Sequence, residues 1–537
     1  MTETTECDVV IVGAGFAGLY MLHRARSLGM DAVVLEAGGG VGGTWYWNRY
    51  PGARCDVESL EYSYQFSDEL QQEWQWTERY AGQAEILAYL EHVADRFDLR
   101  RDILLNSRVQ QAVFDETSGR WAVDADGDRT WSGRFLVMAT GCLSSTNTPA
   151  FSGLDTFEGT SFHTGRWPHE PVDFTGQRVG VVGTGSSGIQ SIPVIARQAR
   201  QLVVFQRTPA YSVPAHNHPL DENEQRAVKA DYATFRRENS QQVFALGSRQ
   251  PLNDIPALGA GPEERTRVFG ERWEHGGLPF LGAFNDLLLD SAANATAAAF
   301  VRDQIRRVVI DTDVAERLMP STVIGCKRLC VDTGYYETFN RDNVELVDVS
   351  RSPIEEITTG GPRVGDRIVE LDCLVFATGF DAMTGALSRI DIRGRDGLSL
   401  EEAWSEGPRT YLGLAVAGFP NLFTVTGPGS PSVLTNMVVS IEHHVDWITS
   451  CLDYLRLHGH RTIEAEAEAQ DSWVAHVNDI AGFTLFPSCN SWYLGANVPG
   501  KPRVFMPLVG FPPYVEQCDA VAAQGYQGFA LSTGPGD

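Results

Sequence analysis

Two glycine-rich turns constrain this chain more than any other feature. The first follows the apolar run 8–12 and carries Gly13, Gly15 and Gly18. Apolar residues then recur at helical spacing, and a second β-branched run ends at Glu36. Strand, glycine turn, helix, strand and acid in this order predict a Rossmann-type dinucleotide site. The glycines let the backbone approach a pyrophosphate, and the acid accepts hydrogen bonds from ribose hydroxyls.

The second turn repeats this pattern but ends differently. "VVGTGSSG" carries Gly183, Gly185 and Gly188, and the following strand, "QLVVFQRTP", ends in Arg207 and Thr208 instead of an acid. An acid there would repel a 2′-phosphate, whereas an arginine can bind it through two donors. We therefore expect the first fold to bind FAD or NAD and the second to bind NADPH. The alternative is that Arg207 is an ordinary solvent-facing arginine at a strand end.

The rest of the chain is organised around these two folds. Two "ATG" stretches, at 139–141 and 377–379, each end a strand-like run and suggest crossings between nested domains. We expect an α/β protein with two Rossmann-like dinucleotide-binding domains. The expected FAD-binding domain spans 1–150 and 380–537, the NADPH-binding domain spans 151–214 and 326–379, and residues 215–325, with their helical periodicity, form a helical insertion in the NADPH domain.

Charge and composition exclude several classes of partner. The net charge is −26, which disfavours nucleic acids and anionic membranes. "MTETTECDVV" does not look like a signal peptide, and no apolar run reaches the roughly 18–20 residues of a membrane span. We expect a cytoplasmic protein, a monomer or a weak homo-oligomer. Nine cysteines without zinc-like spacing predict reduced, mostly packing thiols and no metal site, because the nearest pair, Cys326 and Cys330, lacks C-x-x-C spacing.

Two dinucleotide folds imply hydride transfer from NADPH to a flavin and leave three classes of protein. A disulfide reductase needs a redox-active cysteine pair near the first fold, where only Cys55 occurs. A flavin-containing oxygenase needs no nucleophilic side chain, because the flavin supplies the chemistry. A non-catalytic sensor would bind the cofactors and oxidise no NADPH with any ketone.

The stretch 157–168, "FEGTSFHTGRWP", favours the oxygenase. Its residues Phe157, Gly159, His163, Trp167 and Pro168 match every specified position of F-x-G-x-x-x-H-x-x-x-W-P. The chain thereby resembles the Baeyer–Villiger monooxygenases, and further similar stretches are "GGTWYWNRYPGARCDVES" (42–59), "CKRLCVDTGYYETFNRDNV" (326–344) and "SWYLGANVPGKPRVF" (491–505). Within that family it looks most similar to the phenylacetone, steroid and acetone monooxygenases.

The fingerprint itself is expected on a linker between the nucleotide domains. There, His163 and Trp167 would hold the relative geometry of the domains. The alternative is a hydrogen-bonded core histidine and a core aromatic residue.

The resemblance implies an NADPH- and O₂-dependent FAD monooxygenase that inserts oxygen next to a ketone carbonyl and gives esters or lactones. Arg328 matches the family's catalytic arginine, and Asp56 matches a carboxylate that orients it. A fixed cation suits this role because it stabilises developing negative charge. Lys327 matches a contact to the NADPH ribose-phosphate, and Trp492 matches a tryptophan on a loop that closes on bound NADP⁺. The alternatives are a structural salt bridge for Arg328 and a surface aromatic residue for Trp492.

The remaining implied contacts follow the matched motifs. For FAD they are Gly13, Gly15, Gly18, Glu36, Thr44, Trp45, Asp56, Tyr62 and Met437. For NADPH they are Thr184, Gly185, Ser186, Ser187, Gly188, Gln190, Arg207, Thr208 and Lys327. Further expected cofactor contacts are Trp47, Arg54 and Val109. The expected substrate-pocket residues are Val433, Leu434 and Met437.

The segment 427–437 carries no charge, so we expect a neutral ketone as substrate together with O₂. Methyl or aryl-alkyl ketones are the first expectation. A preference for cyclic ketones, or a sulfoxidising or N-hydroxylating activity, is the alternative. Cys326, where Thr or Ala is common, and Pro512–Pro513, where relatives often have glycines, depart from the family pattern and bear on pocket shape. His443–His444 are expected to be a surface or packing pair.

Overall fold

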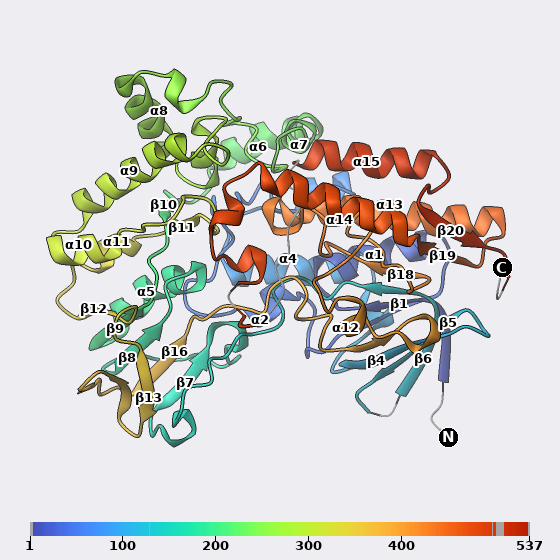
Figure 1. The fold of residues 1–537 in the computed structure, drawn as a ribbon, viewed down its shortest axis with the longest axis horizontal. Coiled ribbons are helices and arrows are strands. Elements are labelled where there is room, and N and C mark those ends of the chain that lie inside the picture. The colour runs from blue at the N-terminus through green and yellow to red at the C-terminus, as the bar shows by residue number, and fades with distance from the viewer. Residues whose placement is uncertain (1–3, 128, 497, 501–509, 535–537) are drawn as a thin grey trace.

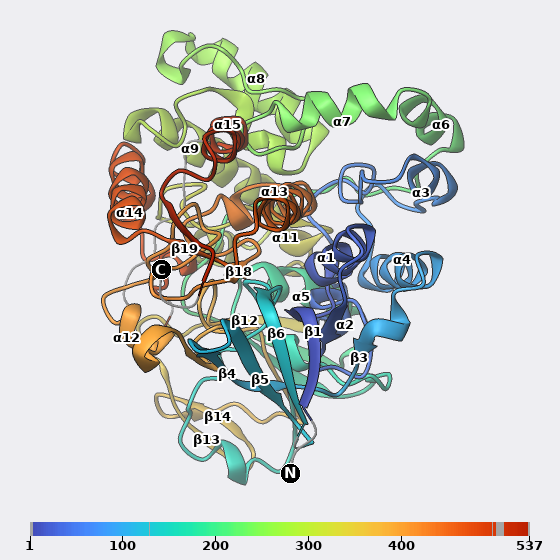
Figure 2. The same cartoon turned by 90° about the vertical axis from the view of Figure 1, so that its right-hand side faces the viewer.

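The computed structural model describes residues 4–127, 129–496, 498–500 and 510–534. Residues 497 and 501–505 of the motif at 491–505 lie outside the described residues. Two sheets lie side by side, with helices covering them and a helical layer at one end of the molecule (Figures 1 and 2).

The first sheet is built around β1 (Thr4–Val12), which pairs in parallel with β2 (Ala32–Leu35) and β6 (Arg129–Met138). The strand order is β17-β4-β5-β6-β1-β2-β3, and β18 also pairs with β6. The other strands are β3 (Ile103–Leu104), β4 (Val109–Asp115), β5 (Arg120–Ala125), β17 (Asp391–Arg393) and β18 (Leu422–Thr424). The sheet is mixed, because β5 pairs antiparallel with both β4 and β6. Val9, Val10 and Ile11 are fully buried, because β1 lies in its parallel part, where both faces are covered.

Helices and short strands from distant parts of the chain complete this half of the molecule. The helices are α1 (Phe16–Ser27), α2 (Thr44–Trp47), α3 (Asp68–Glu73), α4 (Gln83–Arg96), α12 (Leu400–Ala403), α13 (Met437–His458), α14 (Ala467–Gly482) and α15 (Phe511–Ala523). An antiparallel pair of strands, β19 (Thr462–Ala465) and β20 (Phe529–Ser532), lies near the C-terminus. Pro512 and Pro513 lie in the first turn of α15, where a proline costs no helical hydrogen bond.

The second sheet is parallel throughout, in the order β12-β9-β8-β16-β7. Its strands are β7 (Thr160–His163), β8 (Arg178–Val182), β9 (Gln201–Gln206), β12 (Val344–Asp348) and β16 (Cys373–Phe376). The helices α5 (Ser186–Gln198) and α11 (Tyr335–Thr338) pack against each other beside it, and a small sheet follows, of β13 (Ile354–Thr358), β14 (Gly361–Val364) and β15 (Arg367–Ile368). The predicted α/β class with two Rossmann-like folds is confirmed.

The range 215–325, predicted to be helical, is helical in the structure. Every residue of 215–325 is described, and this range contains helices and no strand. Its α-helices are α6 (Glu222–Ala230), α7 (Tyr232–Ser240), α8 (Pro262–His275), α9 (Ser291–Val308) and α10 (Thr312–Leu318). A parallel pair, β10 (Ser212–Pro214) and β11 (Cys330–Asp332), joins its two ends. Figure 1 shows this layer in green, above the second sheet.

The buried histidines of α13 have a packing role. His444 is fully buried; its Nδ1 accepts a hydrogen bond from the Thr426 backbone N–H, and its Nε2 bonds the Tyr514 hydroxyl. His443 stacks edge-on against Phe511 and Tyr514. Burial lowers the pKa of His443 to about 4. The packing interpretation of this pair is confirmed, and the surface interpretation is wrong for His444.

Two cysteines contradict the expectation of nine reduced thiols. Cys326 and Cys489 form a disulfide, whereas the other seven are free and buried. The bonded pair is separated by 163 residues. Spacing along the chain could not reveal it, because the fold alone brings the two segments together.

Among the described residues, no helix is both long and apolar enough to cross a bilayer, and no group of His, Cys, Asp and Glu side chains could hold a metal ion.

Candidate active site

The two glycine turns have the same geometry. Gly13 has φ +106°, and a Cβ there would lie 2.6 Å from the carbonyl oxygen of Ala139. Gly183 has φ +109°, and its Cβ would lie 2.6 Å from the carbonyl oxygen of Ala377. The two "ATG" stretches directly follow the central strands β6 and β16. The alanine of each stretch packs against the first glycine of the turn in the same fold. No side chain fits between them, so a ligand can approach the backbone at the start of α1 and of α5.

Glu36 lies where the first fold needs an acid. Its carboxylate is 5% exposed and accepts hydrogen bonds from the backbone N–H groups of Ala14 (2.7 Å) and Gly38 (2.6 Å). Burial raises the pKa of this carboxyl, and the two N–H groups partly oppose that rise. The carboxylate is thus fixed beside the glycine turn, which fits an adenosine ribose held by its hydroxyls.

Gly13 and Gly183 hold equivalent positions in the two turns, so replacing each one should weaken the binding of a different cofactor. Gly13→Ala forces a Cβ against a carbonyl oxygen at a positive φ, so we expect FAD to bind about tenfold more weakly, or worse. Gly183→Ala should keep FAD and weaken NADPH binding instead. FAD content after purification and NADPH titration measure the two effects. Equal loss of both cofactors in both variants would contradict separate sites.

A single cleft of about 1620 Å³ runs between the two folds. Most predicted cofactor residues line it. Of the residues predicted to contact FAD, and of the further cofactor contacts, those that line it are Gly13, Gly15, Glu36, Thr44, Trp45, Trp47, Arg54, Asp56, Tyr62, Val109 and Met437. Of the residues predicted to contact NADPH, those that line it are Thr184, Gly185, Ser186, Ser187, Gln190, Arg207, Thr208 and Lys327. Arg328, Val433, Trp492 and Trp167 also line it. The predicted residues that do not are Gly18, Gly188, Leu434, Phe157, Gly159, His163 and Pro168.

Gly18 and Gly188 allow their helices to approach the strands. A Cβ on Gly18 would lie 1.8 Å from the carbonyl oxygen of Gly13, and one on Gly188 would lie 2.3 Å from that of Gly183. Gln190, by contrast, joins the two folds. Its side-chain amide donates to the Arg54 carbonyl oxygen at 3.1 Å and accepts from the Tyr50 hydroxyl at 2.8 Å.

The second fold gathers positive charge at its cleft. Arg207 is exposed just after β9, and no carboxylate among the described residues forms an ion pair with it. Lys327 is half-buried, and its pKa is lowered by burial first and by the charge of Arg207 second. Two neighbouring cations with no acid between them fit a phosphate group.

Arg328 and Asp56 come from different folds and meet in the cleft. The Arg328 Nε and Nη2 donate to the two Asp56 oxygens at 2.9 and 2.6 Å, and Nη1 donates to the Val433 carbonyl oxygen at 2.7 Å. Both side chains are less than one-fifth exposed. Burial alone would lower the pKa of the guanidinium, but Asp56 and Tyr493 outweigh it and raise the pKa well above its usual value. Arg328 is therefore a permanent, oriented cation.

Of the fingerprint residues, Trp167 lines the cleft and the others lie behind it. The segment that carries them runs in the chain from the first sheet to the second, and part of it is ordered as strand β7. Strand β7 is an edge strand of the second sheet, with His163 in register with Phe376 of β16. The His163 Nδ1 accepts from the Gly165 N–H at 3.0 Å, so its Nε2 carries the proton and donates to the Thr378 hydroxyl at 3.2 Å. Burial lowers the pKa of His163, which keeps the ring neutral.

Through Thr378 this histidine reaches the other fold. The Thr378 hydroxyl donates to the carbonyl oxygen of Asn147 at 2.6 Å, on the segment that leaves the first "ATG" stretch. Trp167 is 6% exposed and packs against Phe162 and Phe174. The surroundings of His163 and Trp167 therefore agree with the alternative that His163 is a hydrogen-bonded core histidine and Trp167 a core aromatic residue.

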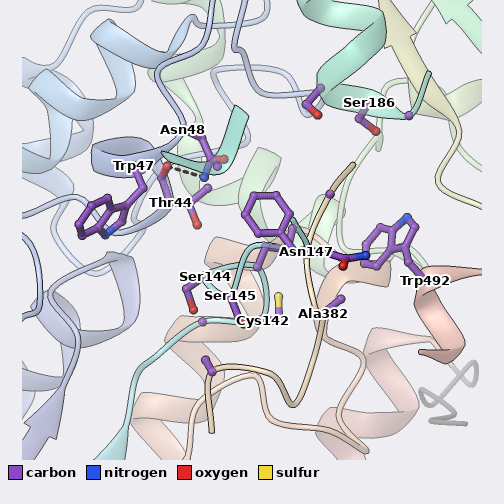
Figure 3. A pocket seen from close by; sticks show the side chains of 18 of the residues that line it. Thr44, Trp47, Asn48, Cys142, Ser144, Ser145, Asn147, Ser186, Ala382 and Trp492 are labelled. Atoms are coloured by element: carbon purple, nitrogen blue, oxygen red, sulfur yellow. Dashed lines mark hydrogen bonds between the residues drawn. The ribbon is translucent and has the colours of Figure 1, made fainter. Parts of the chain in front are cut away.

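Trp492 begins a short 3₁₀ turn, Trp492–Leu494, which Ser491 caps. Figure 3 shows its ring beside Asn147 on one side of the pocket, with Thr44, Trp47 and Asn48 on the other and Ser186 at the upper edge. Its neighbour Tyr493 is buried and interacts with Arg328. Trp492 thus lines the cleft next to Asn147, on the segment that leaves the first "ATG" stretch.

Sequence reasoning missed several lining residues. Five of them follow directly on the first "ATG" stretch or lie near Met437: Cys142, Leu143, Ser144, Ser145 and Thr435. Tyr493 was missed as a partner of Arg328. The available signal was position, because residues just beyond the carboxyl end of a central parallel strand line the crevice of such a sheet.

Comparisons with known proteins agree with this geometry. Residues 10–249 match the family model described as pyridine nucleotide-disulphide oxidoreductase. A Baeyer-Villiger monooxygenase of Pseudooceanicola batsensis is 42% identical over 98% of this chain and 96% of its own length. The acetone monooxygenase (methyl acetate-forming) of Gordonia sp. is 41% identical over 99% and 100%.

A solved structure is closely similar too. An oxidised steroid monooxygenase bound to NADP is 54% identical, with a TM-score of 0.95 over 99% of this chain and 100% of that one. The chain therefore belongs to the Baeyer–Villiger monooxygenases, which are flavin-dependent enzymes that use FAD and NADPH.

Proposed function

We propose that this enzyme oxidises neutral ketones, with methyl ketones preferred, and converts them into acetate esters. The first glycine turn and Glu36 would hold FAD, and the second glycine turn with Arg207 and Lys327 would hold NADPH. O₂ and one small neutral ketone are the other reactants. The predicted cytoplasmic location and the monomeric or weakly oligomeric state stay predictions.

The single observation that carries the proposal is the Arg328–Asp56 pair in the cleft. Bound, reduced FAD would supply the chemistry that activates O₂, of which one atom enters the ester and the other leaves as water. Arg328 donates to the ketone carbonyl oxygen and stabilises the negative charge that develops as the carbonyl carbon becomes tetrahedral. Asp56 holds two of its N–H donors, so the guanidinium is oriented before the substrate arrives.

The pocket around Arg328 is apolar. One cluster contains Cys142, Ala382, Met383, Val433, Phe486 and Tyr493, with Leu143, Leu288, Leu434, Met437 and Trp492 packed against it. A charged substrate would lose its hydration here without compensation, so a neutral ketone is favoured. Covering by Trp492 and Tyr493 would exclude water from the site, which limits loss of activated oxygen.

Competition between ketones tests the substrate class. We expect a methyl ketone such as phenylacetone or 2-octanone to have a higher kcat/KM than cyclohexanone, and the oxygen to enter on its more substituted side. Several ketones should react, because apolar contacts discriminate by only about 1–3 kcal/mol per methylene. Gas chromatography with mass detection identifies the products. A higher kcat/KM for cyclohexanone would contradict the preference.

The second fold predicts the choice of nicotinamide cofactor. Replacing Arg207 by Ala removes one of two cations at the phosphate site, so kcat/KM for NADPH should fall about tenfold, mainly through KM, with NADH unaffected. Arg200→Ala, at the opposite end of β9, is the matched control because this arginine is equally exposed. Equal use of NADH and NADPH by the unmodified enzyme would contradict the assignment.

A further inference from the structure

The disulfide joins two segments that both belong to the cleft. Cys326 directly precedes Lys327 and Arg328. Cys489 lies in residues 485–496, the covering segment, which also contains Asn490 and Trp492. All four of these other residues line the cleft. The two cysteine Cα atoms lie 6.2 Å apart, and the cysteines themselves are almost completely buried. The bond therefore ties the covering segment to the residues that it covers.

The other attachments of this segment are weaker. The Leu485 N–H donates to the Leu288 carbonyl oxygen at 2.9 Å, Phe486 and Tyr493 pack in the apolar cluster, and the Tyr493 phenol interacts with Arg328. Each of these contacts can open and close by itself. A covalent link to Cys326 restricts how far the segment can move away from the cleft.

We propose that Cys326–Cys489 is a redox-controlled latch that keeps the Trp492 segment closed over the cleft. The proposal rests on the proposed function, because closure matters to an enzyme that must retain activated oxygen. With the bond formed, the segment stays in place and NADPH oxidation is coupled to oxygen insertion. With the bond reduced, the segment opens more often and more of the oxygen leaves as hydrogen peroxide.

Hydrogen peroxide is also the oxidant that we propose for closing the latch. The two thiols lose two electrons and two protons and become the disulfide, while one peroxide becomes two waters. A dithiol such as dithiothreitol reverses the bond, becoming a cyclic disulfide as the two cysteines regain their protons. Hydrogen peroxide released from the cleft would thus form the disulfide and hold the covering segment closed, which limits further release.

Counting thiols tests the bond independently of activity. The holoenzyme is treated with hydrogen peroxide or with dithiothreitol, denatured and alkylated, and its mass is measured. We expect seven alkylated cysteines after peroxide and nine after dithiothreitol, with a cross-linked peptide pair containing Cys326 and Cys489 in the first sample. Nine alkylated cysteines in both samples would overturn the proposal, even if the enzyme oxygenates ketones as proposed.

Proteolysis tests the closure itself. Chymotrypsin cleaves after aromatic residues, and Trp492 and Tyr493 in the covering segment are its sites; Phe486 is not one, because Pro487 follows it. Cleavage there should be about tenfold faster or more in the reduced holoenzyme. Cys489→Ala should be cleaved at the reduced rate with or without peroxide. The matched control Cys7→Ala, which removes a buried free cysteine of β1, should respond to peroxide as the unmodified enzyme does.

Coupling gives the functional readout. The share of oxidised NADPH that appears as hydrogen peroxide should rise about tenfold on reduction and to the same level in Cys489→Ala. Dithiothreitol should have no further effect on that variant, which separates loss of the bond from loss of packing. Equal cleavage rates and equal coupling in the oxidised and reduced enzyme would overturn the latch, whereas absence of ketone oxygenation in a protein whose cleavage still depends on the bond would overturn only the proposed function.

Discussion

We expect the replacement of Arg328 by Ala to abolish ester formation while NADPH still reduces the flavin. The loss is expected to be about a hundredfold or more, because one preorganised donor at a developing oxyanion typically contributes that much. Removal of the cation also leaves the Asp56 carboxylate without its partner inside the cleft. Single-turnover absorbance gives the rate of flavin reduction, and product analysis gives the rate of ester formation.

Two further variants make this result specific to Arg328. Arg328→Lys keeps the charge but loses the two-pronged contact with Asp56, so it should recover only a small part of the activity. Arg178→Ala removes a guanidinium that is likewise paired with an aspartate, Asp372, but lies outside the cleft lining. That control should keep its oxygenation rate. Oxygenation by Arg328→Ala at the normal rate would end the catalytic assignment.

His163→Ala slows both hydride transfer and oxygenation and leaves FAD bound. The imidazole bonds Thr378, which in turn bonds the carbonyl of Asn147 on the segment that leaves the other fold. Losing this contact loosens the relative placement of the two cofactor sites, and a misplacement of about 1 Å can cost about a hundredfold in rate. Stopped-flow reduction and the ratio of ester to hydrogen peroxide measure the two effects.

His163→Gln serves as the comparison, since a side-chain amide can still donate to Thr378 and should recover part of the rate. If either variant changed only substrate affinity, with normal reduction and normal coupling, the positioning role of His163 would be wrong.

The cofactor folds were predictable because each depends on residues adjacent in the chain. Gly13, Gly18 and Glu36 act within one strand–helix–strand unit, and the structure places them as their spacing predicts. The contact between Arg328 and Asp56 spans 272 residues, and it entered the sequence analysis only through resemblance to a family. Local patterns of charge and periodicity cover only a few turns of the chain, so they cannot predict a contact between residues this far apart.

The features that the sequence did not predict have the same physical origin. Pairing of β7 with β16 and bonding of Cys326 to Cys489 both join segments that are remote in the chain. A short stretch such as 160–163 looks like a linker until a partner strand is known, since its hydrogen bonds lie with that partner. Lining residues such as Cys142 and Thr435 were missed because their types are ordinary and only their place in the fold is special.

Labelled oxygen tests the central claim most directly. The holoenzyme is supplied with NADPH, 2-octanone and ¹⁸O₂, and the ester is analysed by mass spectrometry alongside NADPH consumption. The account predicts one ¹⁸O atom per ester, in the oxygen between the carbonyl carbon and the migrated group, in step with NADPH. Unlabelled ester, or NADPH oxidation that yields hydrogen peroxide and no ester from any ketone, would contradict it.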